Sequence, residues 1–191
     1  MKDFNRKDLW TIPNIICYVR ILLIPVFTYI YVTAESMADY RLASVIVLFS
    51  SFTDLFDGMI ARRFNMVTDL GKVLDPVADK LTHAALAVCL AVRYPLMRVL
   101  LVLMVIKEGY MSVIGIIMLK KGKMLNGAMW FGKVCTALLF AGLFTLFFFP
   151  SLPLRLVNGI IFVLLAAMAY TLIRYLGVYR RMLRTGGEDG V

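Results

Sequence analysis

Six long apolar runs fill most of this chain, and they restrict its fold more than any other feature. The runs cover roughly residues 13–34, 41–61, 76–93, 95–119, 127–149 and 154–178. A helix needs about 20 mostly apolar residues to cross a bilayer, and within lipid the backbone amides must be hydrogen-bonded inside the protein. The sequence therefore predicts an all-α integral membrane protein with six transmembrane helices.

The composition agrees with this fold and leaves little room for a soluble domain. Hydrophobic residues make up 61% of the 191 residues, charged residues make up 17%, and the mean hydropathy is +0.83. Such values lie outside the usual range for soluble domains. We expect a single membrane domain over residues 1–185 and a disordered tail over residues 186–191.

The first 11 residues mix basic and apolar side chains, as an amphipathic helix on a membrane surface does. We therefore expect an N-terminal interfacial helix before the first span, which Pro13 would begin. A cleaved signal peptide is the less favoured alternative, because the first apolar run is longer than the apolar core of a typical signal peptide.

Basic residues between the apolar runs give the chain a net charge of +9. This arrangement suits an anionic membrane leaflet better than nucleic acid, so we expect no nucleic-acid partner. Twelve cations fall on one predicted side of the membrane: Lys2, Arg6, Lys7, Arg62, Arg63, Lys72, Lys120, Lys121, Lys123, Arg180, Arg181 and Arg184. Four fall on the other side: Arg41, Arg93, Arg98 and Arg155. The positive-inside rule then places both termini and the segment joining spans two and three in the cytoplasm, as in a multi-pass protein of the inner membrane.

A pattern of four aspartates stands at the end of the second apolar run and the start of the third. It reads Asp54-x2-Asp57-Gly58-x2-Ala61-Arg62-x8-Gly71-x3-Asp75-x3-Asp79. A charge at the centre of a membrane helix costs roughly 2.5 to 3.5 kcal/mol on insertion scales, so four should persist only where cations or water offset that cost. One aspartate alone would more simply be solvated or part of a structural ion pair. The fixed spacing of the whole pattern favours a functional site.

The spacing brings the carboxylates of each pair to one helix face. Asp54 and Asp57 are i and i+3, and Asp75 and Asp79 are i and i+4. A short connection can bring the two pairs together, and converging carboxylates need a divalent cation between them. All-oxygen ligation favours Mg²⁺ or Mn²⁺ over zinc. We also expect Pro76 in the first turn of the third span, with Asp75 at or near its N-cap.

Small residues and an arginine beside these aspartates indicate a phosphate ligand. Gly58 and Ala61 lie one turn apart, where short side chains let a ligand approach the backbone. Arg62 can hold a phosphate, and two metal ions could clamp the attacking and leaving oxygens at a phosphorus atom.

At its fixed positions the pattern resembles, without departure, the signature of the CDP-alcohol phosphatidyltransferase family. The resemblance implies a six-helix fold, usually homodimeric, and transfer of a phosphatidyl group from CDP-diacylglycerol to an alcohol, with CMP as the leaving group. It implies two divalent ions on the cytoplasmic side, bound by Asp54, Asp57, Asp75 and Asp79. Asp79 would be a ligand or the base that deprotonates the acceptor. The implied CMP-binding positions are Gly58, Ala61, Arg62 and Gly71.

Further stretches resemble the branch of this family that uses glycerol 3-phosphate and makes phosphatidylglycerophosphate for phospholipid biosynthesis. They are residues 13–25, 74–80 and 132–136. Cys17 and Lys107 depart from that branch, which commonly has threonine and arginine at these positions. Family members that form cardiolipin, with phosphatidylglycerol as the acceptor, are the alternative.

Basic residues within or at the edges of the spans are candidates for binding the acceptor phosphate. They are Lys133, Lys107, Arg20, Lys80 and Arg174. Each could instead extend its stem to the membrane interface or pair with an acid such as Glu108. Lys133 and Lys107 are the preferred candidates, because their predicted span ends face the cytoplasm. His83, the only histidine, is not assigned as a ligand.

An ion-coupled membrane transporter is the alternative from a different class, because buried aspartates can form an ion path. Transporters of that kind show inverted repeats and place acids in both halves. Here the acids cluster in one half and no internal repeat is detectable. The sequence therefore favours the enzyme.

Overall fold

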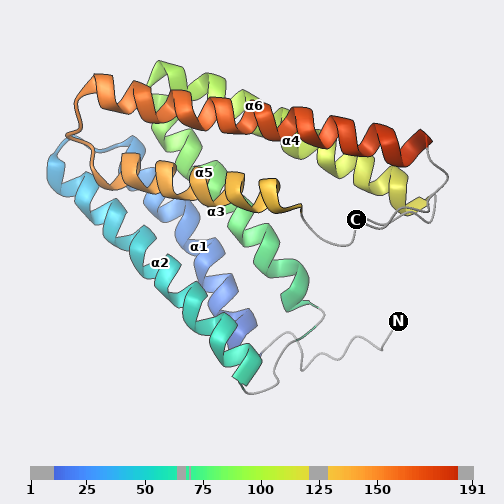
Figure 1. The fold of residues 1–191 in the computed structure, drawn as a ribbon. Helices are drawn as coiled ribbons and strands as arrows, with labels where there is room; N and C mark the ends of the chain where they lie inside the picture. The colour runs from blue at the N-terminus through green and yellow to red at the C-terminus, as the bar shows by residue number, and fades with distance from the viewer. Residues whose placement is uncertain (1–10, 64–67, 69, 121–128, 185–191) are drawn as a thin grey trace. The chain divides into compact units, whose positions relative to one another are not determined.

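The structure is a computed structural model that describes residues 11–63, 68, 70–120 and 129–184, without the side chains of residues 54–62, 72, 119 and 182–184. Within these residues the chain forms six helices and no strand (Figure 1). The helices are α1 (Ile12–Val32), α2 (Met37–Arg63), α3 (Gly71–Arg93), α4 (Pro95–Lys120), α5 (Trp130–Phe148) and α6 (Leu154–Arg184). Each overlaps one of the predicted apolar runs, and the all-α prediction is confirmed.

In the described part of the chain, four helices contain segments long and apolar enough to cross a membrane: Ile12–Val32, Pro95–Met118, Trp130–Phe148 and Leu154–Arg181. α2 and α3 carry the aspartates, and α3 has Asp75, Asp79 and Lys80 within its first ten residues. The structure thus supports a multi-pass helical membrane protein, whereas membrane crossing by α2 and α3 stays a prediction. The predicted interfacial helix and the tail at 186–191 lie outside the described residues, apart from Thr11.

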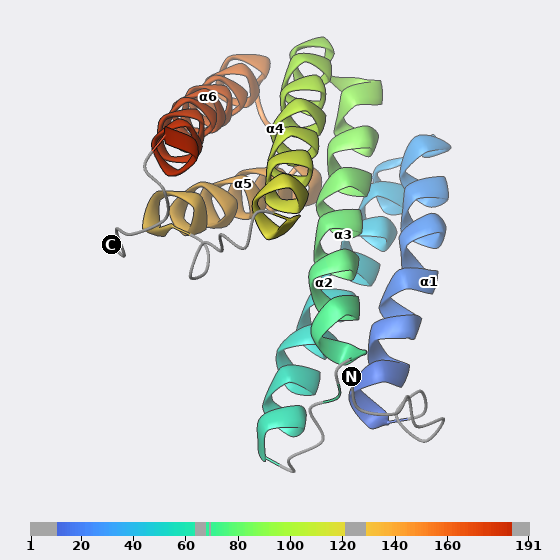
Figure 2. The same cartoon turned by 90° about the vertical axis from the view of Figure 1, so that its right-hand side faces the viewer.

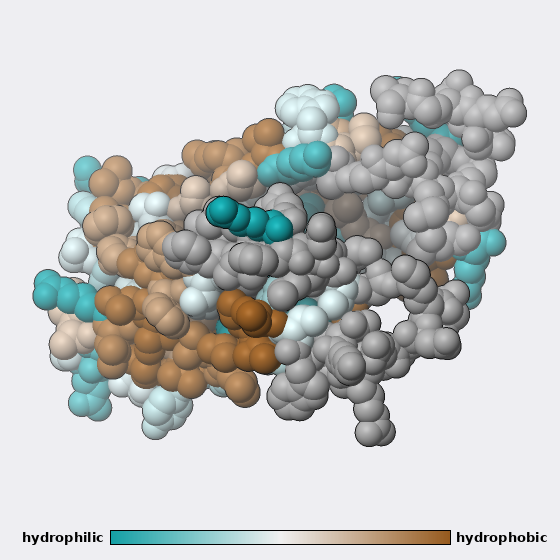
Figure 3. All heavy atoms as spheres, turned by 90° about the horizontal axis from the view of Figure 1, so that it is seen from below, coloured by the Kyte–Doolittle hydropathy of each residue, from teal (hydrophilic) through white to brown (hydrophobic). Residues whose placement is uncertain are grey.

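Large apolar side chains cover much of the described surface. Leu22, Tyr29, Phe162 and Ile173 are each between 66% and 70% exposed. Figure 3 shows hydrophobic side chains, in brown, gathered over a broad part of the face that it presents. Soluble monomers rarely expose contiguous apolar patches larger than a few hundred Å². A surface of this kind suits contact with lipid.

The first of two compact units contains α1, α2, most of α3 and residues 147–150. α1 packs along α2 (Figures 1 and 2). The buried side of α1 carries Asn14 and Arg20 in its first half, and Phe27 and Tyr31 in its second half. The Tyr31 ring stacks on Phe147 with centroids 4.3 Å apart, and Phe27 meets Phe147 edge-on at 5.9 Å. α1 therefore has a polar end and an aromatic end.

The second unit contains α4, most of α5 and α6, with α4 packed against α6. Its core includes a cluster of Met118, Phe131, Tyr175 and Tyr179. The rings of Phe131 and Tyr175 meet edge-on with centroids 4.9 Å apart. A Cβ atom at Gly132 would collide with the Tyr175 hydroxyl, so this glycine lets α5 and α6 approach closely.

α3 begins earlier than the sequence predicted. It starts at Gly71, so Asp75 and Pro76 lie inside the helix and not at its cap. The Thr68 hydroxyl accepts a hydrogen bond from the Gly71 amide at 2.9 Å and satisfies one of the free amides at this helix start. The prediction of Asp75 at or near the N-cap, with Pro76 in the first turn, is therefore wrong. Pro13 does lie in the first turn of α1, as predicted.

α2 begins with a reciprocal capping arrangement. The amide and hydroxyl of Ser36 donate to Asp39 Oδ2 at 2.9 and 2.8 Å, and the Asp39 amide donates to Ser36 Oγ at 3.3 Å. The Glu35 amide donates to the same carboxylate oxygen at 3.1 Å. These hydrogen bonds lower the pKa of Asp39 from its ordinary value, and the bond from the Ser36 hydroxyl has the largest effect.

Candidate functional site

The first half of the aspartate motif lies in the last ten residues of α2. Its members are Asp54, Asp57, Gly58, Ala61 and Arg62. Their backbone is helical, as the i, i+3 spacing of the aspartates requires, but their side chains are outside the described part of the structure. Their roles as metal ligands and nucleotide-binding positions therefore stay predictions.

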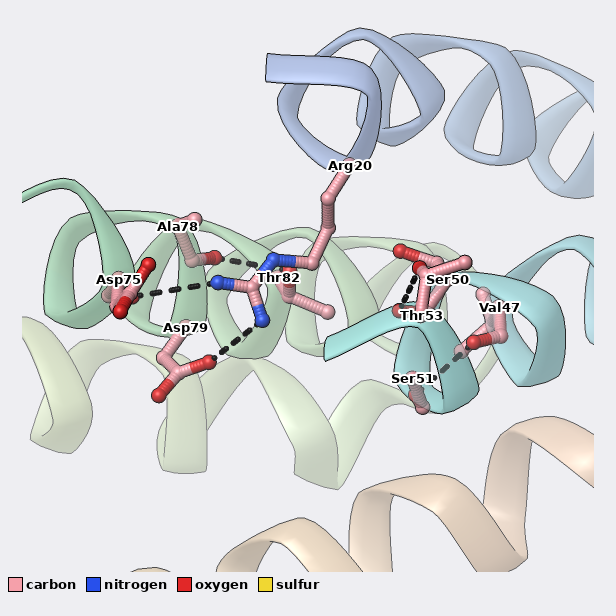
Figure 4. A network of polar contacts seen from close by, with 9 residues as sticks. All are labelled: Arg20, Val47, Ser50, Ser51, Thr53, Asp75, Ala78, Asp79 and Thr82. Carbon is pink, nitrogen blue, oxygen red and sulfur yellow. Dashed lines mark hydrogen bonds and ion pairs between the residues drawn. The ribbon is translucent and has the colours of Figure 1, made fainter. Parts of the chain in front are cut away.

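Arg20 is a buried cation that joins α1 to α3 (Figure 4). Its side chain is only 4% exposed. Nη1 donates to Asp79 Oδ1 at 3.1 Å, and Nη2 donates to the backbone carbonyl of Asp75 at 3.4 Å. A buried charge is destabilising unless it is paired and hydrogen-bonded. The contact therefore stabilises Arg20 and holds Asp79 toward α1.

Asp75 and Asp79 lie one turn apart on α3, and both are exposed. The Asp79 side chain remains 54% exposed in spite of its ion pair. Exposed carboxylates one turn apart offer oxygen ligands that suit Mg²⁺ or Mn²⁺, so this half of the motif fits the predicted metal chemistry. Among the described residues, which leave out the carboxylates of Asp54 and Asp57, no group of three metal-binding side chains converges. The two-ion site stays a prediction.

Gly71 packs closely against α1. The Asn14 side chain is buried, and its Nδ2 donates to Thr68 Oγ1 at 3.1 Å. A Cβ atom at Gly71 would lie 2.9 Å from Asn14 Oδ1 and 3.1 Å from Thr68 Oγ1. Gly71, predicted to bind CMP, therefore also makes room for a polar contact at the start of α3.

Sequence reasoning missed the roles of Asn14 and Thr68. The available signal was an asparagine in the first apolar run, because a buried amide needs hydrogen-bond partners. The identity of the partner was not readable, since Thr68 lies 54 positions further along the chain.

The predicted acceptor-binding cations are divided between the two units. Arg20 and Lys80 belong to the first unit, where Lys80 is exposed. Lys107, Lys133 and Arg174 belong to the second unit. The single pocket predicted from all five stays a prediction.

In the second unit the three cations come from the three helices around the aromatic cluster. Arg174 of α6 lies over the Phe131 ring, 5.3 Å from its centroid. Lys107 of α4 is buried and donates to Glu108 Oε1 at 2.9 Å. Lys133 of α5 is exposed. Lys107 is thus paired with the acid that the sequence offered as its alternative partner.

The apolar helices, together with the charged contact between α1 and α3, define a helical membrane protein with a polar site at the start of α3. A profile of the CDP-alcohol phosphatidyltransferase family matches residues 10–175. The chain belongs to this family. The predicted family is confirmed.

Relatives with assigned names come from fungi and bacteria. The chain is 42% identical over 89 residues to the cardiolipin synthase (CMP-forming) / mitochondrial hydrolase fusion protein of Schizosaccharomyces pombe. The matched stretch covers 46% of this chain and 14% of that protein. The chain is 39% identical over 79 residues to a CDP-diacylglycerol-glycerol-3-phosphate 3-phosphatidyltransferase of Rickettsia typhi, covering 41% of this chain and 44% of the relative. A protein of the same name from Shigella flexneri serotype 5b is 30% identical over 175 residues, covering 90% and 96%. The chain thus spans less than half the length of the first two relatives and nearly all of the third.

Proposed function

We propose that this protein transfers a phosphatidyl group from CDP-diacylglycerol to glycerol 3-phosphate with the help of Mg²⁺ or Mn²⁺. The products would be phosphatidylglycerophosphate and CMP. The observation that carries the proposal is the complete aspartate motif in a chain that matches, over 90% of its length, a protein named for this transfer. A relative in Pectobacterium atrosepticum with the same name is 34% identical over 79% of this chain.

In the proposed reaction the acceptor hydroxyl oxygen bonds to the phosphatidyl phosphorus, and the bond from that phosphorus to the CMP oxygen breaks. Asp79 would accept the hydroxyl proton or bind metal. Metal ions, when bound, would neutralise the pyrophosphate and stabilise the departing CMP. The residues that would hold them are Asp54, Asp57, Asp75 and Asp79.

The contact with Arg20 supports a fixed position for Asp79 in either role. One carboxylate oxygen of Asp79 accepts a hydrogen bond from a guanidinium that is itself buried between helices. A misplacement of about 1 Å in a reactive group can lower a rate roughly a hundredfold. Arg20 would therefore act through Asp79. For the acceptor phosphate, Lys133 and Lys107 are the preferred binding residues.

The proposed function includes a topology and an assembly. α2 and α3 would complete a set of six membrane spans, with their acids offset by the bound cations. The excess of twelve over four cations supports a cytoplasmic position for both termini and the site in the inner membrane. We propose a homodimer, as is usual in the family.

Cardiolipin synthesis is a second candidate function, with phosphatidylglycerol as the acceptor. The observation that favours it is the Schizosaccharomyces pombe relative, which is more similar to this chain over a shorter stretch. The two candidates share the donor, the metal site and the release of CMP, so they differ only in the acceptor.

The acceptor is tested by CMP release from CDP-diacylglycerol, with purified protein in detergent and Mg²⁺ or Mn²⁺. Glycerol 3-phosphate, phosphatidylglycerol and inositol phosphate are supplied separately. Metal-dependent release with glycerol 3-phosphate alone is the expected result. Release with phosphatidylglycerol alone would move the assignment to cardiolipin synthesis, and no release from folded protein would favour an ion-coupled transporter.

A further inference from the structure

An open groove of about 540 Å³ runs between α5 and α6 in the second unit. These helices lie side by side (Figure 1). Most of the lining is aliphatic, from Leu138 and Ala141 of α5 and Leu156 and Val163 of α6. The volume falls within the roughly 300–1,000 Å³ of ordinary small-molecule pockets. An apolar, elongated ligand fits this lining.

Two glycines give the groove its shape. A Cβ atom at Gly142 would lie 2.7 Å from Leu164 Cδ1, so this glycine lets the helices approach at one point. A Cβ atom at Gly159 would meet nothing within 4 Å, so the groove is open there. At Gly159 the groove therefore has free space, which a larger side chain would fill.

One end of the groove is positively charged. Arg155 lines it and lies in the first turn of α6, where there is no acidic residue. Arg155 is exposed and makes no hydrogen bond or ion pair with any other residue in the described part of the chain. The free amides at a helix start add further positive potential. An anion would compensate both charges.

We propose that this groove binds one anionic phospholipid from the surrounding bilayer, with an acyl chain along α5 and α6 and the phosphate at Arg155. The bilayer supplies molecules that join an anionic phosphate to a long alkyl chain. The site is distinct from the predicted acceptor site, since Arg155 and Arg174 are 19 positions apart on one helix, or roughly 28 Å at 1.5 Å per residue. The distribution of cations places it in the leaflet away from the cytoplasm.

The charge is tested by native mass spectrometry of the purified protein with dioleoyl-phosphatidylglycerol or dioleoyl-phosphatidylcholine. The wild type should bind phosphatidylglycerol at least about fivefold more tightly. Arg155→Gln should remove that preference, and Arg41→Gln, which changes another exposed arginine on the same predicted side, should keep it. Equal binding of both lipids by the wild type, or an unchanged preference in Arg155→Gln, would overturn the proposal.

The groove itself is tested by Gly159→Leu, which should lower the binding of both lipids at least about threefold. Gly177→Leu is the matched control, because a Cβ atom there also meets nothing within 4 Å and the residue does not line the groove. Thermal unfolding in detergent confirms that each variant is folded. Lipid binding that survives Gly159→Leu contradicts the proposal, as does the loss of a dimer with lipid binding unchanged, which would assign the groove to a second copy of the chain.

Discussion

Arg20 and Lys107 are both buried cations in helices of a membrane protein, but they are held in different ways. Arg20 pairs with a carboxylate 59 positions away and so ties α1 to α3. Lys107 pairs with Glu108, its neighbour in the chain, and ties no helices together. A buried cation can thus be paired across helices, as Arg20 is, or within one helix, as Lys107 is. Only the first kind of pair contributes to the packing of one helix on another.

Of changes to these two cations, Arg20→Met should have the larger effect, because it removes the long-range pair. Asp79 would lose its fixed position, and CMP release should fall about a hundredfold. Hydrogen bonds to charged groups contribute about 1.5 to 3 kcal/mol, so thermal unfolding in detergent should also shift downward. Arg20→Lys should restore part of both, and Arg41→Met should change neither. Turnover within twofold of the wild type would show that Arg20 does not position the site.

Lys107→Met should affect binding more than stability, because its pair with Glu108 is local. If Lys107 binds the acceptor phosphate, KM for glycerol 3-phosphate should rise about tenfold, equivalent to about 1.4 kcal/mol, while kcat changes little. Lys120→Met, at the exposed end of the same helix, is the control. An unchanged KM would remove Lys107 from the acceptor site and leave it as a local ion pair.

Gly71→Ala tests the packing at the polar end of α1, where Asn14 and Arg20 are both buried. The new Cβ atom would press on Asn14 Oδ1, and overpacking of this kind costs about 1 to 3 kcal/mol. Thermal unfolding should shift downward, whereas Gly109→Ala, whose Cβ atom meets nothing within 4 Å, should be neutral or stabilising. Adding Asn14→Ala to Gly71→Ala should recover part of the loss, since neighbouring changes are not additive. A loss of stability in the double variant equal to the sum of the two single losses would contradict the contact between Gly71 and Asn14.

The smallest effect concerns Asp39, a carboxylate held only by local hydrogen bonds. Its pKa is lowered in the folded protein, so it contributes stability above its unfolded pKa, and that contribution is lost as pH falls through the folded value. Asp39→Asn should therefore be slightly less stable than the wild type at neutral pH. Thermal unfolding measured against pH should show the difference shrinking below about pH 3.8. A difference that grows on acidification would contradict the capping role.

The helices were largely predictable, because each apolar run is long enough to indicate one, and each of the six runs overlaps a helix. The start of α3 was mispredicted because Gly71, Lys72 and Asp75 interrupt the apolar pattern there, whereas the Thr68 hydroxyl accepts a hydrogen bond from the Gly71 amide and so marks the helix start. The i, i+4 relation of Asp75 and Asp79 followed from helical geometry alone. The partner of Arg20 did not, since contacts between α1 and α3 depend on packing that no local pattern encodes. For the same reason, Gly71 suggested a ligand where the structure also shows a packed asparagine.

Metal-dependent transfer at the aspartate motif is tested most directly by measuring CMP release from Asp57→Asn and from Asp39→Asn over a range of Mg²⁺ concentrations. Both changes remove one carboxylate from α2, but only Asp57 belongs to the motif. We predict that Asp57→Asn loses turnover at least about a thousandfold at every Mg²⁺ concentration while its unfolding temperature stays near that of the wild type. Asp39→Asn should keep wild-type turnover. Near-normal turnover in folded Asp57→Asn would contradict the metal site and the function built on it.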